Sequence, residues 1–221
     1  MIKKDHTIVI LELIEDNKVC QMQKKVTRLS GKERRKQIKK CILEIVSKEG
    51  IHKLTTRYLA EKVGVSEGTL FRHFSSKNEM LEEIINDVNN ELIRKLELIS
   101  LEKIPPSERL DKFICLTIKY LHRKKGITLI LFTEASYKND EGLKKIMYNI
   151  YHKQKEFFSK IIKDGVSENY WEKNTDIESL ANLYMGIPVT LNIETILHAS
   201  KFDCSKFCEQ MKSFILKILQ K

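Results

Sequence analysis

Residues Thr55 to Lys77 read TTRYLAEKVGVSEGTLFRHFSSK, and the fold of the chain is decided by this stretch. Leu59, Ala60 and Val63 recur at helical spacing, and the small Ala60 lets a second helix cross close by. Gly64 then ends this helix, because glycine tolerates the left-handed conformation that helix C-termini commonly need. The pattern therefore predicts a short helix followed by a tight turn.

A second short helix is predicted directly after that turn. Ser66 is a strong N-cap for it, and Val65 and Leu70 occupy the N′ and N4 positions of a hydrophobic staple. The second helix of a helix-turn-helix needs one apolar side that docks on the rest of the domain and one side that enters the major groove of DNA. The competing interpretation is a helical hairpin that only packs. The outer face of the second helix carries small, hydrogen-bonding and aromatic groups: Glu67, Gly68, Thr69, Phe71, Arg72 and His73.

The longer stretch LTTRYLAEKVGVSEGTLFRHFSSKNEML, from Leu54 to Leu81, resembles the DNA-binding signature of the tetracycline-repressor (TetR) family of transcriptional regulators. The preceding Arg28 to Gly50 resembles that family's first helix, and the rest of the chain matches only in helix number and length. The resemblance implies a three-helix DNA-binding domain, a dimer and an effector pocket in a second helical domain. It also implies DNA contacts at eight positions: Thr56, Arg57, Gly68, Thr69, Phe71, Arg72, His73 and Lys77.

Thr69 and Arg72 are three residues apart, so both can reach one groove. An arginine there can bind guanine through two hydrogen bonds, and a threonine can meet a thymine methyl or a phosphate. We expect Leu70 and Phe74 to belong to the core. Glu67 stays open between accepting from a cytosine and stabilising the helix start.

Charge is concentrated at the N-terminal end of the chain. Of the net +10, residues 1–80 hold 18 Lys and Arg against 10 Asp and Glu, whereas residues 81–221 hold 22 against 20. Such clustering indicates a polyanionic partner. A peripheral membrane protein is the alternative, but the basic cluster has no Trp or Phe anchors of its own.

The five cysteines are odd in number and no secretory signal precedes them, which favours reduced, mostly buried thiols in a cytoplasm. The longest apolar runs are too short to span a bilayer. No catalytic constellation, metal site or cofactor motif is apparent, so we expect no enzyme activity, metal or cofactor. These cysteines are Cys20, Cys41, Cys115, Cys204 and Cys208.

Capping signals and apolar stripes predict an all-α chain of about nine helices, the first of which is capped by a Ser30–Glu33 capping box and closed by Gly50. We expect an N-terminal extension at 1–29, in which Thr7 to Ile14 is either a strand or a helical face, a DNA-binding domain at 30–76, and an effector-binding and dimerisation domain at 77–221. A single long helix from Ser76 to about Ser100 would join the two domains. Three later helices are expected at Ser107–Lys125, Ile127–Ala135 and Asp140–Asp164, the last of them ended by Gly165. Another helix should begin at a capping box formed by Thr175 and Glu178, and the final helix should begin at Ser205.

The sequence thus predicts a cytoplasmic ligand-responsive regulator, a repressor that binds a palindromic DNA operator as a homodimer and is released by a small molecule. A helical-bundle enzyme or small-molecule carrier is the alternative. Aromatic, Met and polar residues of the second domain are candidates for the pocket that the resemblance implies: Phe113, Tyr120, Phe132, Glu134, Tyr148, Tyr151, Asn182 and Met185. Apolar stripes of the last two helices are candidates for the dimer interface: Leu180, Tyr184, Leu191, Phe207, Met211, Phe214, Ile215 and Ile218.

Overall fold

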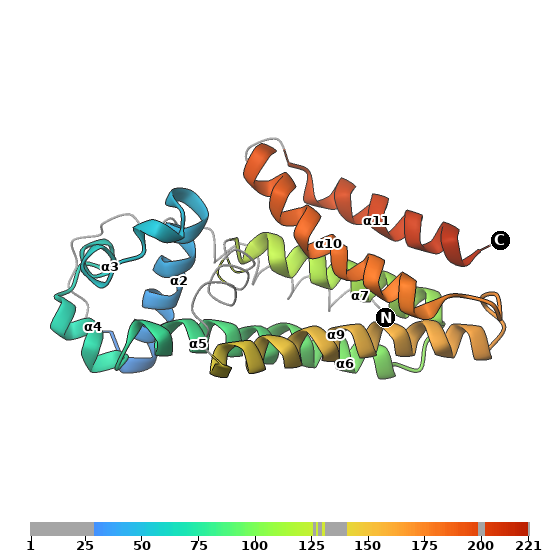
Figure 1. Cartoon of the computed structure of the whole chain (residues 1–221), viewed down its shortest axis with the longest axis horizontal. Coiled ribbons are helices and arrows are strands. Elements are labelled where there is room, and N and C mark those ends of the chain that lie inside the picture. The colour runs from blue at the N-terminus through green and yellow to red at the C-terminus, as the bar shows by residue number, and fades with distance from the viewer. Residues whose placement is uncertain (1–28, 126, 128–129, 131–140, 199–201, 221) are drawn as a thin grey trace, which may run out of the picture.

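The all-α fold is confirmed by a computed structural model of the chain, which describes residues 29–125, 127, 130, 141–198 and 202–220. Every regular element within these ranges is helical (Figure 1). In chain order they are α2 (Gly31–Glu49), the 3₁₀ turn η1 (Ile51–Lys53), α3 (Thr56–Val63), α4 (Glu67–His73), α5 (Lys77–Val88), the π-helical segment η2 (Asn89–Ile93), α6 (Arg94–Leu101), α7 (Pro106–Arg123), α9 (Glu141–Ser167), α10 (Ile177–His198) and α11 (Cys204–Leu219).

The N-terminal helices begin and end where the capping pattern predicts. Ser30 and Glu33 form the expected capping box, with the Ser30 amide 2.8 Å from the Glu33 carboxylate and the Glu33 amide 3.3 Å from Ser30 Oγ. Gly50 and Gly64 end α2 and α3 with φ of 88° and 78°, a region that only glycine enters without strain. Helices α2, α3 and α4 lie together at one end of an elongated molecule (Figure 1).

The helix that joins the two ends of the molecule has the predicted extent but is less regular than predicted. It is helical from Lys77 to Leu101, yet η2 interrupts it with one π-helical stretch. Such insertions are rare and often occur at functional sites. Both α5 and α6 pack along α9, so this connector contacts the second domain over much of its length.

The second domain is organised around α7, which packs against α9, α10 and α11. Tyr184 of α10 is fully buried, stacked on Phe158 with ring centroids 4.3 Å apart and close to Phe113 at 5.5 Å. Its hydroxyl lies 2.8 Å from Thr117 Oγ1 and accepts from Gln154 Nε2 at 2.6 Å. This buried polar group is therefore satisfied, as stability requires.

Several helix boundaries differ from their predictions, including both ends of α7, which was expected at Ser107–Lys125 and lies at Pro106–Arg123. Gly165 lies inside α9, which runs on to Ser167, and its missing side chain makes room for the Trp171 ring, since a Cβ there would approach Trp171 Cε3 to 2.1 Å. Asp176, not Thr175, caps α10 by accepting from the Ser179 amide at 3.1 Å. Asp203 caps α11 one residue earlier than expected.

The prediction of reduced thiols is wrong for one pair of cysteines. Cys115 of α7 and Cys208 of α11 form a disulfide, with their Cα atoms 5.6 Å apart. These residues are 93 positions apart in sequence, so only the packing of α11 on α7 brings them together. Cys41 is buried, and Cys204 is a half-buried free thiol.

Some predictions lie outside the described residues: the extension at 1–28 with its ambiguous segment at 7–14, Cys20, and most of the helix expected at 127–135. Among the helices that are described, none is long and apolar enough to cross a membrane. Nor do the described residues gather three or more His, Cys, Asp or Glu side chains that could hold a metal ion.

Candidate DNA-binding surface

The helix-turn-helix is built by short-range caps and a small apolar contact. Thr55 caps α3 by accepting from the Tyr58 amide at 3.1 Å, and Ser66 caps α4 by accepting from the Thr69 amide at 3.2 Å. Leu59 of α3 and Leu70 of α4 are buried, which fixes the two helices against each other. The start of α4 is thereby presented at the surface.

The predicted core residues of this motif are confirmed. Leu70 is fully buried and Phe74 is 1% exposed. Glu67, whose role the sequence left open, accepts a hydrogen bond from Thr56 Oγ1 at 2.9 Å. This contact ties the beginning of α3 to the beginning of α4.

The outer face of α4 carries the two side chains predicted to read base edges. Arg72 Nη2 donates to Thr69 Oγ1 at 2.9 Å, and Ser66 Oγ lies 3.0 Å from the same oxygen. Phe71 is 46% exposed on the same helix. All eight residues that the family resemblance marks as DNA contacts lie at the surface, exposed or half-buried, at the end of the molecule formed by α2, α3 and α4: Thr56, Arg57, Gly68, Thr69, Phe71, Arg72, His73 and Lys77.

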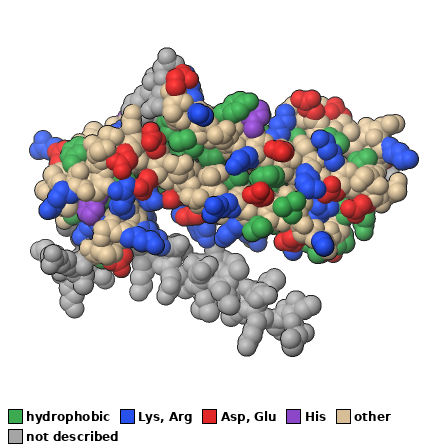
Figure 2. Space-filling model, turned by 90° about the horizontal axis from the view of Figure 1, so that it is seen from below, with side chains coloured by type: hydrophobic (Ala, Val, Ile, Leu, Met, Phe, Trp, Pro, Cys, Tyr) green, Lys and Arg blue, Asp and Glu red, His purple; other side chains and the backbone are tan. Residues whose placement is uncertain are grey.

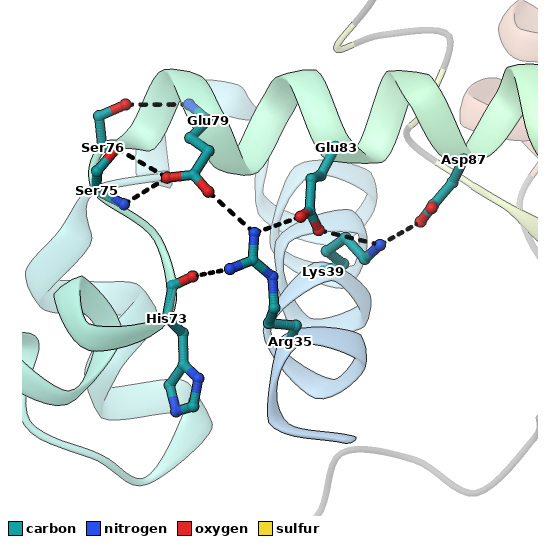
Figure 3. A network of polar contacts seen from close by, with 8 residues as sticks. All are labelled: Arg35, Lys39, His73, Ser75, Ser76, Glu79, Glu83 and Asp87. Atoms are coloured by element: carbon teal, nitrogen blue, oxygen red, sulfur yellow. Dashed lines mark hydrogen bonds and ion pairs between the residues drawn. The ribbon is translucent and has the colours of Figure 1, made fainter. Parts of the chain in front are cut away.

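Arg35 of α2, which the sequence did not single out, fixes the end of α4 (Figure 3). Its guanidinium donates to the main-chain carbonyl of His73 and forms ion pairs with Glu79, at 2.9 Å, and Glu83 of α5. The same group lies 4.1 Å from the centre of the Phe74 ring. One side chain therefore joins α2, the last residue of α4 and the first turns of α5.

Lys39, one turn after Arg35, extends this network along α5. Its ammonium lies 3.4 Å from Glu83 and 2.7 Å from Asp87 (Figure 3). Two cations four residues apart on α2 thus face carboxylates spaced by four on α5. The Arg35–Lys39 and Glu79–Glu83–Asp87 spacings are visible in the sequence and are its only signal of this network.

The charge at the end of the molecule formed by α2, α3 and α4 favours the binding of a polyanion. Figure 2 shows Lys and Arg side chains, with a histidine and some Asp and Glu among them, over the end formed by α2, α3 and α4. Burial, together with Arg34, Arg35 and Arg72, lowers the pKa of His73, so its imidazole is neutral near pH 7. The positive charge near α4 therefore comes from arginine and lysine.

The described residues among those predicted to form an effector pocket differ in their burial and position. Phe113 is buried beside Tyr184, whereas Tyr148 and Tyr151 are 62% and 42% exposed on the outside of α9. Asn182 is also exposed, and Phe132 and Glu134 lie outside the described residues. Met185 is half-buried, and Tyr120 lines a cleft between α2, α5 and α7.

The predicted interface residues divide into two groups. Five are buried inside this chain and are core residues: Leu180, Tyr184, Leu191, Phe207 and Ile215. Met211 is half-buried, and Phe214 and Ile218 are 52% and 46% exposed on one side of α11. The sequence missed that α10 also has an exposed apolar stripe, consisting of Leu183, Val189, Ile193 and Leu197.

Known proteins resemble this chain at two levels. A family model described as bacterial regulatory proteins, tetR family, matches residues 42–84, which includes the whole helix-turn-helix. The nucleoid occlusion factor SlmA of Shewanella sediminis is 29% identical over 154 residues, 70% of this chain and 78% of that protein. SlmA of Shewanella halifaxensis is 28% identical over 182 residues, 82% of this chain and 92% of that protein.

Solved structures share the fold over most of the chain. The ketosteroid transcriptional regulator KstR2 of Mycobacterium tuberculosis superimposes with a TM-score of 0.72 at 18% identity, over 85% of this chain and 95% of that one. The TetR family regulator PfmR of Thermus thermophilus superimposes with a TM-score of 0.69 at 19% identity, over 84% of this chain and 95% of that one. FadR of Bacillus subtilis, solved in complex with stearoyl-CoA, superimposes with a TM-score of 0.64 at 17% identity, over 81% of this chain and 96% of that one. The family match on the motif, together with relatives that align over most of the chain, identifies the helix-turn-helix of this DNA-binding regulator as that of the tetR family of bacterial regulatory proteins.

Proposed function

We propose that this regulator is a repressor that binds a palindromic operator as a homodimer and releases it when a small molecule binds. Residues 30–76 are the DNA-binding domain and residues 77–221 the effector-binding and dimerisation domain in this proposal. The observation that carries it is the outer face of α4, where Thr69 and Arg72 are presented together while Arg35 holds the helix end. Eight residues are the proposed DNA contacts: Thr56, Arg57, Gly68, Thr69, Phe71, Arg72, His73 and Lys77.

DNA recognition is tested first by selecting bound sequences from genomic DNA with the purified protein. Arg72→Ala should then cost about 1–3 kcal/mol of binding free energy and relax preference at one operator position, because a base contact is lost. Lys77→Ala should weaken all sequences alike and reduce the slope of affinity against salt by about one unit, because a phosphate contact is lost. Lys153→Ala, on the exposed side of α9, is the control.

Unchanged operator binding in both the Arg72 and Lys77 variants would show that another face meets the DNA.

Dimerisation is proposed through the exposed apolar side of α10 and α11. Leu183, Val189 and Ile193 of α10 and Phe214 and Ile218 of α11 are large apolar residues left in solvent in a single chain. A two-fold axis would double the effect of every substitution in such a surface. One helix-turn-helix reads too few base pairs for specificity, so two copies are needed on a palindrome.

Phe214→Asp combined with Ile218→Asp should yield monomers by analytical ultracentrifugation and weaken operator binding. Leu98→Asp, on α6 and 66% exposed, is the matched control. A double variant that still sediments as a dimer would refute the proposed interface.

The effector is proposed to act through the connector from Lys77 to Leu101. This helix carries the Glu79 and Glu83 partners of Arg35 at one end and packs on α9 along its length. A shift of the connector would change the spacing of the two recognition helices, which must match a groove repeat of about 34 Å. FadR was solved with stearoyl-CoA, so long-chain acyl-CoA is the first class of effector to screen.

Linkage gives the test of this mechanism. Coupling of about 1–3 kcal/mol corresponds to a change in affinity of about 5–150-fold, and operator DNA must weaken the effector by the same factor. Effector affinity is therefore measured by titration calorimetry with and without operator. Equal affinities would exclude that molecule as an inducer.

A second candidate function is nucleoid occlusion, the role in the name of the SlmA relatives that align over most of the chain. Deleting the gene and measuring transcription beside the mapped binding sites separates the two. Changed transcription supports the regulator, whereas unchanged transcription with altered placement of division relative to the nucleoid supports the second candidate.

A further inference from the structure

A basic cleft lies between the two domains. It has a volume of about 1300 Å³, with α2 and α5 on one side and the C-terminal end of α7 on the other. Ten lysine and arginine side chains line it against five carboxylates. Its apolar walls include Ile84 and Ile127, which are almost fully buried. The cleft therefore combines an excess of positive charge with a small uncharged surface.

Two buried polar atoms of the cleft wall have no hydrogen-bond partner among the described residues. These are the hydroxyl of Tyr120, a residue only 3% exposed, and Nδ1 of His122. Burial, with Glu91 and Asp87 nearby, raises the pKa of Tyr120, so the hydroxyl stays protonated and can donate. Buried polar groups are normally paired, so unpaired ones at a cleft wall indicate a missing partner.

At least three of the ten cationic side chains have no ion pair among the described residues. Lys39 is paired with Glu83 and Asp87, and Lys124 with Glu91. Lys36, Lys119 and Lys125 are exposed and have no ion pair within the described part of the chain. A ligand with several negative charges would find cations on both walls, from α2 and from the end of α7.

We propose that this cleft binds a small phosphorylated molecule that carries at least two negative charges and an uncharged part, and that its binding weakens operator affinity. The uncharged part lies against Ile84 and Ile127, and a polar atom of the ligand accepts from Tyr120. The proposal rests on the proposed function only in that operator binding is the regulated activity. The cleft differs from the predicted pocket, because Tyr120 is the only described residue of the predicted set that lines it.

The expected coupling to DNA has an electrostatic cause. Arg35 and Lys39 line the cleft and also belong to the network that holds α4 on α5. An anion bound there neutralises positive charge close to the DNA-binding domain and competes for these two cations. Both effects lower the affinity for a polyanionic duplex.

Binding is measured by titration calorimetry on the full-length protein with coenzyme A, inorganic pyrophosphate and inorganic phosphate as probes. Coenzyme A should bind best, because it alone supplies both several charges and an uncharged arm. Lys119→Glu combined with Lys125→Glu should weaken coenzyme A roughly tenfold or more. Tyr120→Phe should weaken coenzyme A binding several-fold without loss of folding, since the buried hydroxyl that it removes has no geometric hydrogen bond to any described residue.

The control is Lys145→Glu combined with Lys153→Glu, an equal change of charge on exposed positions of α9 away from the cleft. This variant should bind coenzyme A like the wild type. Absence of binding by all three probes, or equal binding by the cleft and control variants, overturns the proposal.

Operator affinity is measured separately, with and without coenzyme A. If the wild type does not bind the operator even without a probe, the proposed function is refuted. The ligand site can still be tested by calorimetry in that case. If the cleft variant loses operator affinity but keeps coenzyme A affinity, its lysines contact DNA and the proposal is wrong. Coenzyme A that binds in the cleft and weakens the operator complex several-fold confirms it.

Discussion

Replacing Arg35 with alanine tests whether a side chain outside the motif positions the recognition helix. The substitution removes a charge-assisted hydrogen bond to the His73 carbonyl, ion pairs to Glu79 and Glu83, and the contact with the Phe74 ring. No other described residue replaces the guanidinium between α2, α4 and α5, so the carbonyl and carboxylates lose that donor.

The magnitude follows from the contacts and the exposure of the side chain. The hydrogen bond from a charged group contributes about 1.5–3 kcal/mol, and the lower value applies because the Arg35 side chain is 33% exposed. The ring contact adds about 0.5–1 kcal/mol and each screened ion pair about 0.2–1 kcal/mol. We therefore expect Arg35→Ala to lower the free energy of unfolding by about 2–4 kcal/mol.

Urea unfolding followed by circular dichroism measures this change. Arg35→Lys keeps the charge but cannot bridge three acceptors, so it should lower the free energy of unfolding by about half as much as Arg35→Ala does. Arg34→Ala is the matched control, because the Arg34 guanidinium bonds Gln37 of its own helix, and it should change stability by less than about 0.5 kcal/mol.

Operator affinity is then measured at a temperature where every variant is folded. Because α4 is misplaced, the Arg35→Ala variant should bind the operator about tenfold more weakly than the wild type, which is the effect of losing one base-pair contact. A variant with wild-type stability and wild-type affinity would refute the reasoning and show that apolar contacts alone hold α4.

The other predictions concern the second domain and the response to pH. Gly165→Ala should destabilise the protein by about 1–3 kcal/mol in thermal unfolding, because its Cβ meets a ring, whereas Gly186→Ala has open space and should be neutral or stabilising. Tyr184→Phe should cost about 1–3 kcal/mol by leaving a buried amide unpaired, and the exposed Tyr148→Phe almost nothing. Partial burial alone would raise the pKa of Glu83, but Arg35 and Lys39 outweigh it and lower that pKa. The stability that Glu83 contributes is thus fully present above its unfolded pKa of about 4.3 and is lost as pH falls through the lower folded value, a loss that Glu83→Gln should reduce in acid unfolding titrations.

Sequence alone determined the parts of this protein that depend on neighbours in the chain. The Ser30 and Ser66 caps, the glycine turns and the burial of Leu70 all follow from contacts within a few residues, and all are found in the structure. The helix-turn-helix, the all-α fold and the family resemblance follow from these local rules.

Tertiary structure decided where distant residues meet and which faces remain exposed. The Arg35 network joins residues 38 to 48 positions apart, and the disulfide joins Cys115 to Cys208, so no local spacing reveals either pairing. On α10 apolar residues occupy opposite sides, with Tyr184 buried and Ile193 exposed, so periodicity could not tell core from outer face. Side chains on one helix become core, cleft or surface only when α7, α9 and α11 pack around them, because burial is a property of the assembled helices.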